Sequence, residues 1–248
     1  MKNQLFKLIF IVLLFVSIKG LAQNGNEFSI ASGFLQLKEE FNQGMVFDGV
    51  QFDFQYKKSW SFSKFEISYQ PEVAIGVSFD RKMTAVNFDL SPVNVTFVAT
   101  VFERNAHELK VGGNFATNYN YQAYPDLHSG HLFWFTEIGL SPQIEYSYKW
   151  KNQLVNVLFT NSLLGFVSRP EKNDPYFYSL KFVDFIKFAH QDLKFGSFDK
   201  YNHTQISITY IPNISGKHSF ALGADYEDVY FGVRFQKLIY YLRWKFSF

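Results

Sequence analysis

The chain has 248 residues, no cysteine, 20% aromatic residues and a formal net charge of +2. This length fits one large β domain or two small ones, and the lack of cysteine excludes stabilisation by disulfide bonds.

Residues 1–22 have the pattern of a removable export signal. Lys2 and Lys7 form a basic start, residues 8–18 are an apolar run too short to cross a bilayer as a helix, and Gly20-Leu21-Ala22 supplies small residues around a cleavage point. An uncleaved anchor is the less favoured alternative. Removing the signal leaves 21 basic and 22 acidic residues, so no nucleic-acid binding is expected. No cysteine follows the apolar run, which excludes a lipoprotein anchor.

Residues 23–248 form one expected domain, with no further apolar run near the ~20 residues that a membrane helix requires. If the exported protein enters a membrane, a closed β-barrel is the remaining way to satisfy every backbone group in lipid.

Alternation of apolar and polar residues predicts ten strands. In chain order they cover residues 28–38, 50–57, 64–79, 86–102, 109–121, 134–150, 154–167, 203–212, 220–226 and 238–248, and the last can begin as early as Tyr230. The third alternates over about fifteen residues, longer than the ~5–6 of a usual soluble strand. Pro71 removes a ladder donor and predicts a local gap. A change of phase at Ser91-Pro92 predicts a β-bulge in the fourth strand.

The last eleven residues show the two faces of a strand most clearly. Because successive side chains point to opposite faces, Arg243 and Lys245 share one face. The opposite face is wholly apolar and aromatic, with Leu238, Tyr240, Leu242, Trp244, Phe246 and Phe248. Such a division, with lipid on one side and a wet lumen on the other, is typical of a transmembrane barrel strand.

The connections between the predicted strands alternate in length. Short ones near residues 57–59, 103–108, 151–153 and 213–217 alternate with longer ones, and the longest covers residues 169–199. Short periplasmic turns and longer outer loops are the pattern of bacterial barrels, which places both termini in the periplasm. Within the longest loop, residues 182–190 fit a short amphipathic helix that caps the barrel mouth, gates the lumen or docks a protein partner.

These features together resemble the Gram-negative outer-membrane β-barrel proteins, at the level of architecture and over the whole exported chain. The resemblance implies an all-β, transmembrane, antiparallel up-and-down barrel in the lipid of the cell outer membrane, with about ten strands and eight or twelve as alternatives. It also implies that the barrel-assembly machinery recognises the C-terminal aromatic strand, through Tyr240, Leu242, Trp244, Phe246 and Phe248.

Charged residues of both signs fall on the faces predicted to point inward. They are Asp53, Lys57, Lys64, Glu66, Glu72, Lys110, Glu137, Glu145, Lys149, Arg243 and Lys245. Buried charges must pair or meet water, so we expect either a network of ion pairs that stiffens the barrel or a narrow polar conduit. For Arg243 and Lys245 the expected partners are the inward glutamates.

Histidines and aspartates gather in and beside the loops predicted at the outer rim. Asp126, His128, His131, His190 and His203 form the candidate rim site, since a histidine beside carboxylates can activate a water molecule. The Asp126, His128 and His131 spacing is only a weak metal-binding pattern, so neither a metal nor another cofactor is expected.

These patterns favour a narrow channel or a structural or interaction barrel. A hydrolase acting on lipid or peptide at the outer rim is the alternative, and a soluble secreted β-protein is a third.

Overall fold

The computed structural model describes residues 23–40, 44–81, 83–126, 131–162, 164–168, 190, 193–197, 200–230 and 234–248. The predicted export signal, and the predicted helix up to residue 189, lie outside the described residues. Among the described residues, no helix is long and apolar enough to cross a membrane.

The described chain consists of antiparallel strands. They are β1 Gln23–Glu39, β2 Met45–Phe62, β3 Phe65–Tyr69, β4 Glu72–Asp80, β5 Met83–Arg104, β6 His107–Tyr124, β7 His131–Trp150, β8 Gln153–Asn161, β9 Leu164–Ser168, β10 Lys194–Ser197, β11 Tyr201–Ile211, β12 His218–Tyr230 and β13 Arg234–Ser247.

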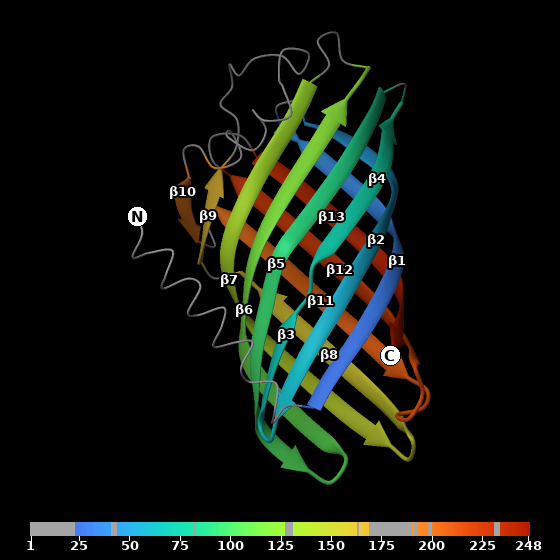
Figure 1. The fold of residues 1–248 in the computed structure, drawn as a ribbon. Coiled ribbons are helices and arrows are strands. Elements are labelled where there is room, and N and C mark those ends of the chain that lie inside the picture. Colours follow the sequence, from blue (N-terminus) through green and yellow to red (C-terminus); the bar gives the residue numbers. More distant parts are fainter. Residues whose placement is uncertain are drawn as a thin grey trace, which may run out of the picture.

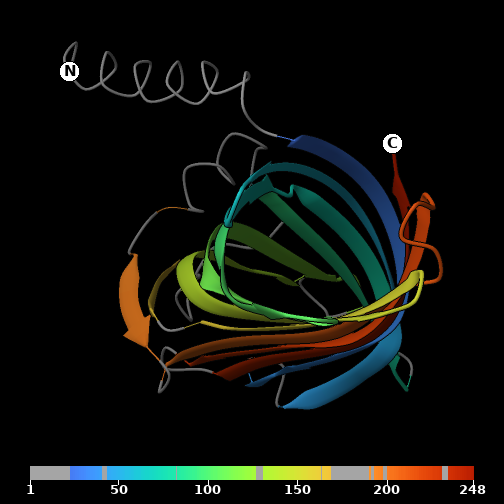
Figure 2. The ribbon, with the colours of Figure 1, turned by 90° about the horizontal axis from the view of Figure 1, so that it is seen from below.

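The strands close into a barrel (Figures 1 and 2). Most strands pair with the next strand along the chain, β8 pairs with β11, and β1 closes the ring against β13. β3 and β4 together make one barrel strand between β2 and β5, and β8 continues as β9 beside β7. The ring therefore has ten strands, as the alternation predicts. The short β10 pairs with β9 and lies outside the ring in Figure 2.

Two irregularities predicted from the sequence are confirmed. β3 ends at Tyr69 and β4 begins at Glu72, so the ladder is interrupted around Pro71, where the missing N–H removes one bond. In β5 the register against β6 shifts between Leu90 and Val93, which is the expected bulge.

The turn predicted at residues 57–59 is wrong. Lys57, Lys58 and Ser59 stay in the ladder opposite Glu27, Asn26 and Gly25, because the backbone keeps pairing although the sequence turns polar. β2 ends at Phe62 instead, and the next residue, Ser63, has a φ of 24°. A positive φ at this position suits the twisted two-residue turns of hairpins.

The two ends of the barrel differ, although less regularly than predicted. We call the end with the connections at 63–64, 105–106, 151–152 and 212–217 the turn end, and the opposite end the loop end. At the loop end the predicted longer connection after β4 is short, since Asp80 pairs with Met83. Both ends of the described chain lie at the turn end, where the Phe248 N–H donates to the Asn26 carbonyl at 3.0 Å.

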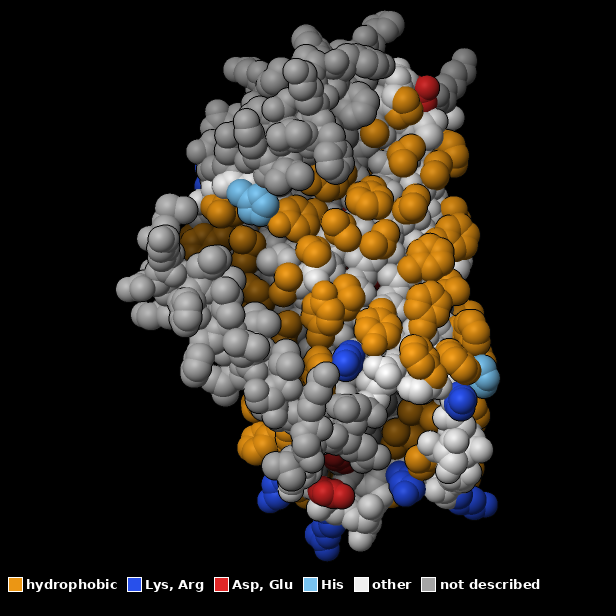
Figure 3. Space-filling model, in the orientation of Figure 1, with side chains coloured by type: hydrophobic (Ala, Val, Ile, Leu, Met, Phe, Trp, Pro, Cys, Tyr) orange, Lys and Arg blue, Asp and Glu red, His pale blue; other side chains and the backbone are white. Residues whose placement is uncertain are grey.

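The outer face of the wall is apolar (Figure 3). Large side chains are exposed there on strands all round the ring, among them Phe34, Val50, Phe52, Ile75, Phe97, Leu140, Ile208, Leu222, Tyr240 and Leu242. In Figure 3 several Lys and Arg side chains lie below this apolar surface, at the turn end. An apolar band on the outside of a closed barrel matches the hydrocarbon layer of a bilayer, and the aromatic face is not buried against a second sheet, as the soluble alternative would require.

Candidate functional site

The loop end of the lumen is filled by an apolar plug. Its buried members come from nine of the ten barrel strands and comprise Ala31, Leu35, Leu37, Phe47, Ala85, Tyr124, Phe133, Phe135, Val167, Tyr201, Val229, Phe235, Ile239 and Tyr241. Most of them lie at the loop end, whereas Ile239 and Tyr241 follow Lys237 on β13 and Ala31 lies opposite Arg243, nearer the turn end. No part of this plug was predicted, because the inward faces were expected to be polar throughout.

Aromatic rings of the plug meet across the barrel. Phe133 and Phe135 on β7 lie with ring centroids 5.5 Å and 5.1 Å from that of Phe235 on β13, although three barrel strands separate β7 from β13. On the other side Phe47 on β2 lies 5.2 Å from Tyr124 on β6. Contacts of this kind narrow the lumen at the loop end, since water cannot pass between rings in van der Waals contact.

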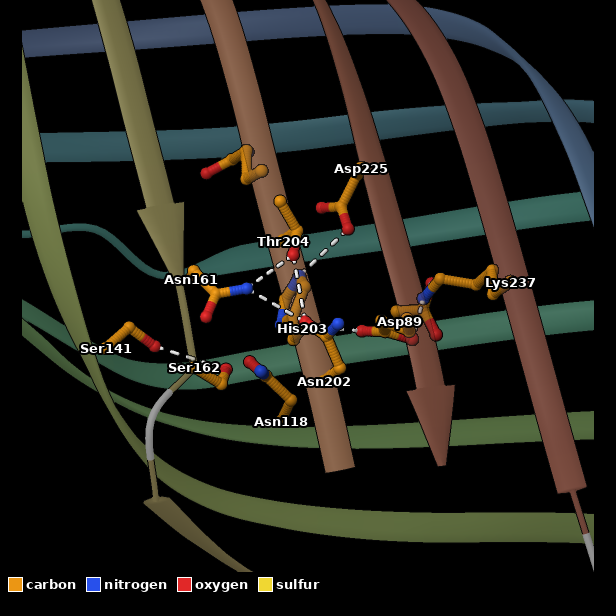
Figure 4. Close-up of polar contacts among 12 residues, drawn as sticks. Asp89, Asn118, Ser141, Asn161, Ser162, Asn202, His203, Thr204, Asp225 and Lys237 are labelled. Carbon is orange, nitrogen blue, oxygen red and sulfur yellow. Dashed lines mark hydrogen bonds and ion pairs between the residues drawn. The ribbon is translucent and has the colours of Figure 1, made fainter. Parts of the chain in front are cut away.

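Below the plug, a cluster of charged residues occupies the middle of the lumen (Figure 4). Lys237 on β13 places its Nζ atom 2.9 Å from Glu227 on the neighbouring β12 and 3.1 Å from Asp89 on β5. Three barrel strands separate β5 from β13, so the pair of Lys237 and Asp89 is a second bridge across the lumen. Glu227 and Lys237 are both buried, where unpaired charges are costly.

His203 on β11 joins this cluster. Its Nε2 atom lies 2.8 Å from Asp225 Oδ1, and its Nδ1 atom lies 3.6 Å from Glu137 Oε2 and 3.8 Å from Glu227 Oε1. Glu137 also accepts a hydrogen bond from the Asn118 amide at 2.8 Å. The imidazole is therefore surrounded by three carboxylates from two strands, β7 and β12.

Nearer the turn end, Arg243 lies between two acids. Its guanidinium is 3.5 Å from Asp53 and 3.6 Å from Glu72, and it donates to the Gln55 side chain at 2.9 Å. Arg243 and Asp53 are buried. Because Arg can donate several bonds in a fixed planar fork, this arrangement ties β13 to β2 and β4 across β1.

At the turn end the charges are more exposed. Glu66 pairs with Lys57 at 3.3 Å and with Lys110 at 3.2 Å, and Lys245 lies 3.8 Å from Glu27. Side-chain exposure falls from 30% at Lys57 to 5% at Lys237, and Phe235 in the plug is fully buried. A polar cavity of about 300 Å³ is lined by residues of all these layers, from Glu27 and Lys57 to Glu227 and Lys237. We call this cavity the chamber, and the exposure gradient shows that it opens toward the turn end.

The structure distributes the predicted lumen residues unevenly. Glu66, Glu72, Lys110, Glu137, Arg243 and Lys245 point inward and take part in the contacts above, and Glu145 accepts a hydrogen bond from Asn156 at 2.5 Å. Lys64 and Lys149 differ from the expectation, since both are exposed at the turn end. The partner of Lys245 is Glu27, which was not among the inward glutamates considered.

The described side chains of the predicted rim site, those of Asp126, His190 and His203, each contact different residues. Asp126 accepts a hydrogen bond from the Thr84 N–H at 2.7 Å, and His190 lies 2.9 Å from the Tyr119 hydroxyl. His203 instead faces the lumen. His128 lies outside the described residues, and of His131 only the backbone, paired with Tyr124, is described.

Four charged residues of the lumen cluster were missed from the sequence: Asp89, Asp225, Glu227 and Lys237. Asp89 and Asp225 occupy the polar faces of predicted strands, so the alternation itself contained the signal. Glu227 lies one residue after the predicted strand 220–226, and Lys237 lies one residue before residues 238–248, so neither was assigned to an inward face. For the plug, the run Phe133-Trp134-Phe135 was the available signal, because consecutive aromatic residues place apolar groups on both faces.

No family model matches the sequence, and no curated protein matches it either. Among solved structures, the outer membrane protease OmpT from Escherichia coli is similar at 8% identity, over 90% of this chain and 97% of that chain, with a TM-score of 0.49. The translocator domain of autotransporter NalP from Neisseria meningitidis is similar at 8% identity, over 99% of this chain and 96% of that chain, with a TM-score of 0.42. An outer membrane channel from Pseudomonas putida F1 is similar at 8% identity, over 92% of this chain and 97% of that chain, with a TM-score of 0.39.

At such identities the similarity concerns the fold alone. The class of the protein follows from its own ladders and surfaces: a closed, antiparallel ring of ten strands with an apolar outer face and a polar interior is the architecture of Gram-negative outer-membrane β-barrel proteins.

Proposed function

We propose that the protein is a structural or interaction barrel of the cell outer membrane whose lumen is closed to passive flow. The plug carries this proposal, because Phe133 and Phe235 meet across the lumen and Lys237 bridges to Asp89 beneath them. The chamber is then a blind polar pocket that opens at the turn end.

The location and orientation are part of the proposal. The apolar outer face supports insertion in a lipid bilayer, and the short turns and both ends of the described chain support a periplasmic turn end. The chamber would then open to the periplasm. Docking of a protein partner on residues 169–199 stays a prediction, since most of that segment lies outside the described residues.

Planar-bilayer recording tests the closed lumen. The purified protein should show no conductance steps, whereas a variant carrying both Phe133→Ala and Phe235→Ala should conduct, because the rings that meet across the lumen are gone. A matched control replaces Phe34 and Phe220, which are exposed on the outer face, and should stay closed. Stable single-channel steps in the unaltered protein, unchanged in the plug variant, would show that the barrel is a channel.

We further propose that the barrel-assembly machinery reads the aromatic face of β13. Phe248→Ala should lower the amount of folded barrel in outer-membrane preparations several-fold, measured as the heat-modifiable band on a gel. The Phe248 ring is exposed, and the backbone bond from its N–H to Asn26 is kept in this variant, so refolding from urea into detergent should be unaffected. Equal amounts of folded protein in cells, for Phe248→Ala and for Phe34→Ala, would contradict the role of the terminal ring.

A further inference from the structure

Three side chains in the mid-lumen cluster converge on one point. His203, Glu137 and Glu227 each offer one ligand atom, and these atoms all lie within 4.8 Å of one another. Two ligand atoms that each lie about 2.1 Å from a tetrahedral ion are roughly 3.4 Å apart. The distances from His203 Nδ1 to the two glutamate oxygens, 3.6 Å and 3.8 Å, are close to that separation.

The other nitrogen of His203 is held as in many metal sites. Asp225 Oδ1 lies 2.8 Å from Nε2, so Nε2–H can donate to this carboxylate while Nδ1 faces the two glutamate oxygens. Without an ion, a proton on Nδ1 would serve these oxygens, and a metal ion bound to Nδ1 would take the place of that proton. A ring nitrogen that donates to a carboxylate while the other binds a metal is the usual outer-shell arrangement of ligating histidines.

Each of the two glutamates also has a polar neighbour that holds its carboxylate. Lys237 Nζ lies 2.9 Å from Glu227 Oε2, whereas Glu227 Oε1 is the oxygen nearer His203. The Asn118 amide donates at 2.8 Å to Glu137 Oε2, the same oxygen that faces His203, so a metal ion would use the second lone pair of this oxygen. Glu137 is 2% exposed and Glu227 is 4% exposed, so each buried carboxylate has an oxygen directed at the shared point and a neighbouring group that fixes its orientation.

The charges of the cluster are also unbalanced. Asp89, Glu137, Asp225 and Glu227 supply four carboxylates, whereas Lys237 supplies one ammonium. With a neutral His203 the cluster therefore has a net charge of −3, and a divalent cation would reduce this to −1. Since the chamber is lined by His203, Glu137 and Glu227, an ion can reach them from the turn end, and water can complete its coordination.

We propose that the chamber binds one divalent transition-metal ion through His203 Nδ1, Glu137 and Glu227, with Asp225 and Lys237 as positioning residues. One imidazole and two carboxylates suit Zn²⁺ and its neighbours in the first transition row better than Mg²⁺ or Ca²⁺, which prefer oxygen ligands alone. This inference does not depend on whether the barrel conducts.

Titration of the folded, chelator-treated barrel in detergent tests the site. Isothermal titration calorimetry with Zn²⁺ and visible absorption with Co²⁺ should both give one equivalent per chain, and Zn²⁺ should displace Co²⁺. Asp225→Asn should keep this stoichiometry and weaken the affinity about 10- to 100-fold, as expected for an outer-shell partner. His203→Ala and Glu137→Gln should each lose the stoichiometric site.

The controls separate this site from other histidines and from misfolding. His107 and His218 lie at the turn end, where they contact Tyr146 and Trp244, and replacing them with alanine should leave the titration unchanged. Heat-modifiable migration identifies the variants that fold. If His203→Ala does not fold, Glu137→Gln still tests the site, because glutamine has nearly the size of the native side chain. The proposal is overturned if the unaltered protein binds no stoichiometric Zn²⁺, or if folded Glu137→Gln and Asp225→Asn bind it as the unaltered protein does.

Discussion

Replacing Arg243 with methionine should destabilise the folded barrel by about 3–5 kcal/mol, the cost of removing one partner from a buried ion pair. The guanidinium lies between Asp53 and Glu72 and donates to Gln55. Without it, two carboxylates face each other in the lumen with no cation between them. Urea unfolding in detergent micelles, followed by tryptophan fluorescence, measures the loss.

A matched control is available in Arg234. This residue also pairs with an aspartate, donating to Asp228 at 2.8 Å, but it is exposed at the loop end. Arg234→Met should therefore cost about 0–1 kcal/mol, as surface pairs do. Adding Asp53→Asn and Glu72→Gln to Arg243→Met should restore most of the lost stability. If the two arginine substitutions lowered the free energy of unfolding equally, the buried ion pairs of Arg243 would stabilise the barrel no more than the exposed pair of Arg234.

Phe235→Ala should lower the free energy of unfolding by about 3–5 kcal/mol, the usual cost of emptying a buried aromatic site. Phe235 is fully buried and contacts both Phe133 and Phe135. Its removal leaves a cavity that these rings cannot fill without leaving their own contacts. The same urea titration measures the effect.

The control for Phe235 is a phenylalanine on the outer face. Phe220 is exposed on β12, where detergent or lipid replaces whatever contact the ring loses, so Phe220→Ala should cost clearly less. If both substitutions have the same small effect, the plug does not contribute packing energy. That outcome would also contradict the proposal that the plug closes the lumen.

The plug and the chamber divide the lumen into an apolar part and a charged part. At the loop end, aromatic and aliphatic side chains exclude water. Toward the turn end, carboxylates, ammonium groups and one imidazole border a polar space of about 300 Å³. This division is the basis for the proposal that the barrel holds a ligand from one side and does not let solutes through.

Much of the barrel was determined by the sequence alone. Alternation with a period of two is a local property of each strand, and it separates a lipid-facing from a lumen-facing side without knowledge of the neighbours. The ten strands, the interruption at Pro71 and the bulge after Leu90 followed from such local signals. The inward direction of Glu66, Glu72 and Arg243 did too.

Only the tertiary structure decided what meets inside. Lys237 and Asp89 are 148 residues apart in the chain and come together because the ring closes between β1 and β13 with one particular register. That stagger sets which lumen residues share a level, and no single strand encodes it. It also placed His203 among Glu137, Asp225 and Glu227 rather than at the rim. In the same way, an inward Phe235 resembles an outward Phe220 in sequence, since burial against rings from opposite strands exists only once the barrel is closed.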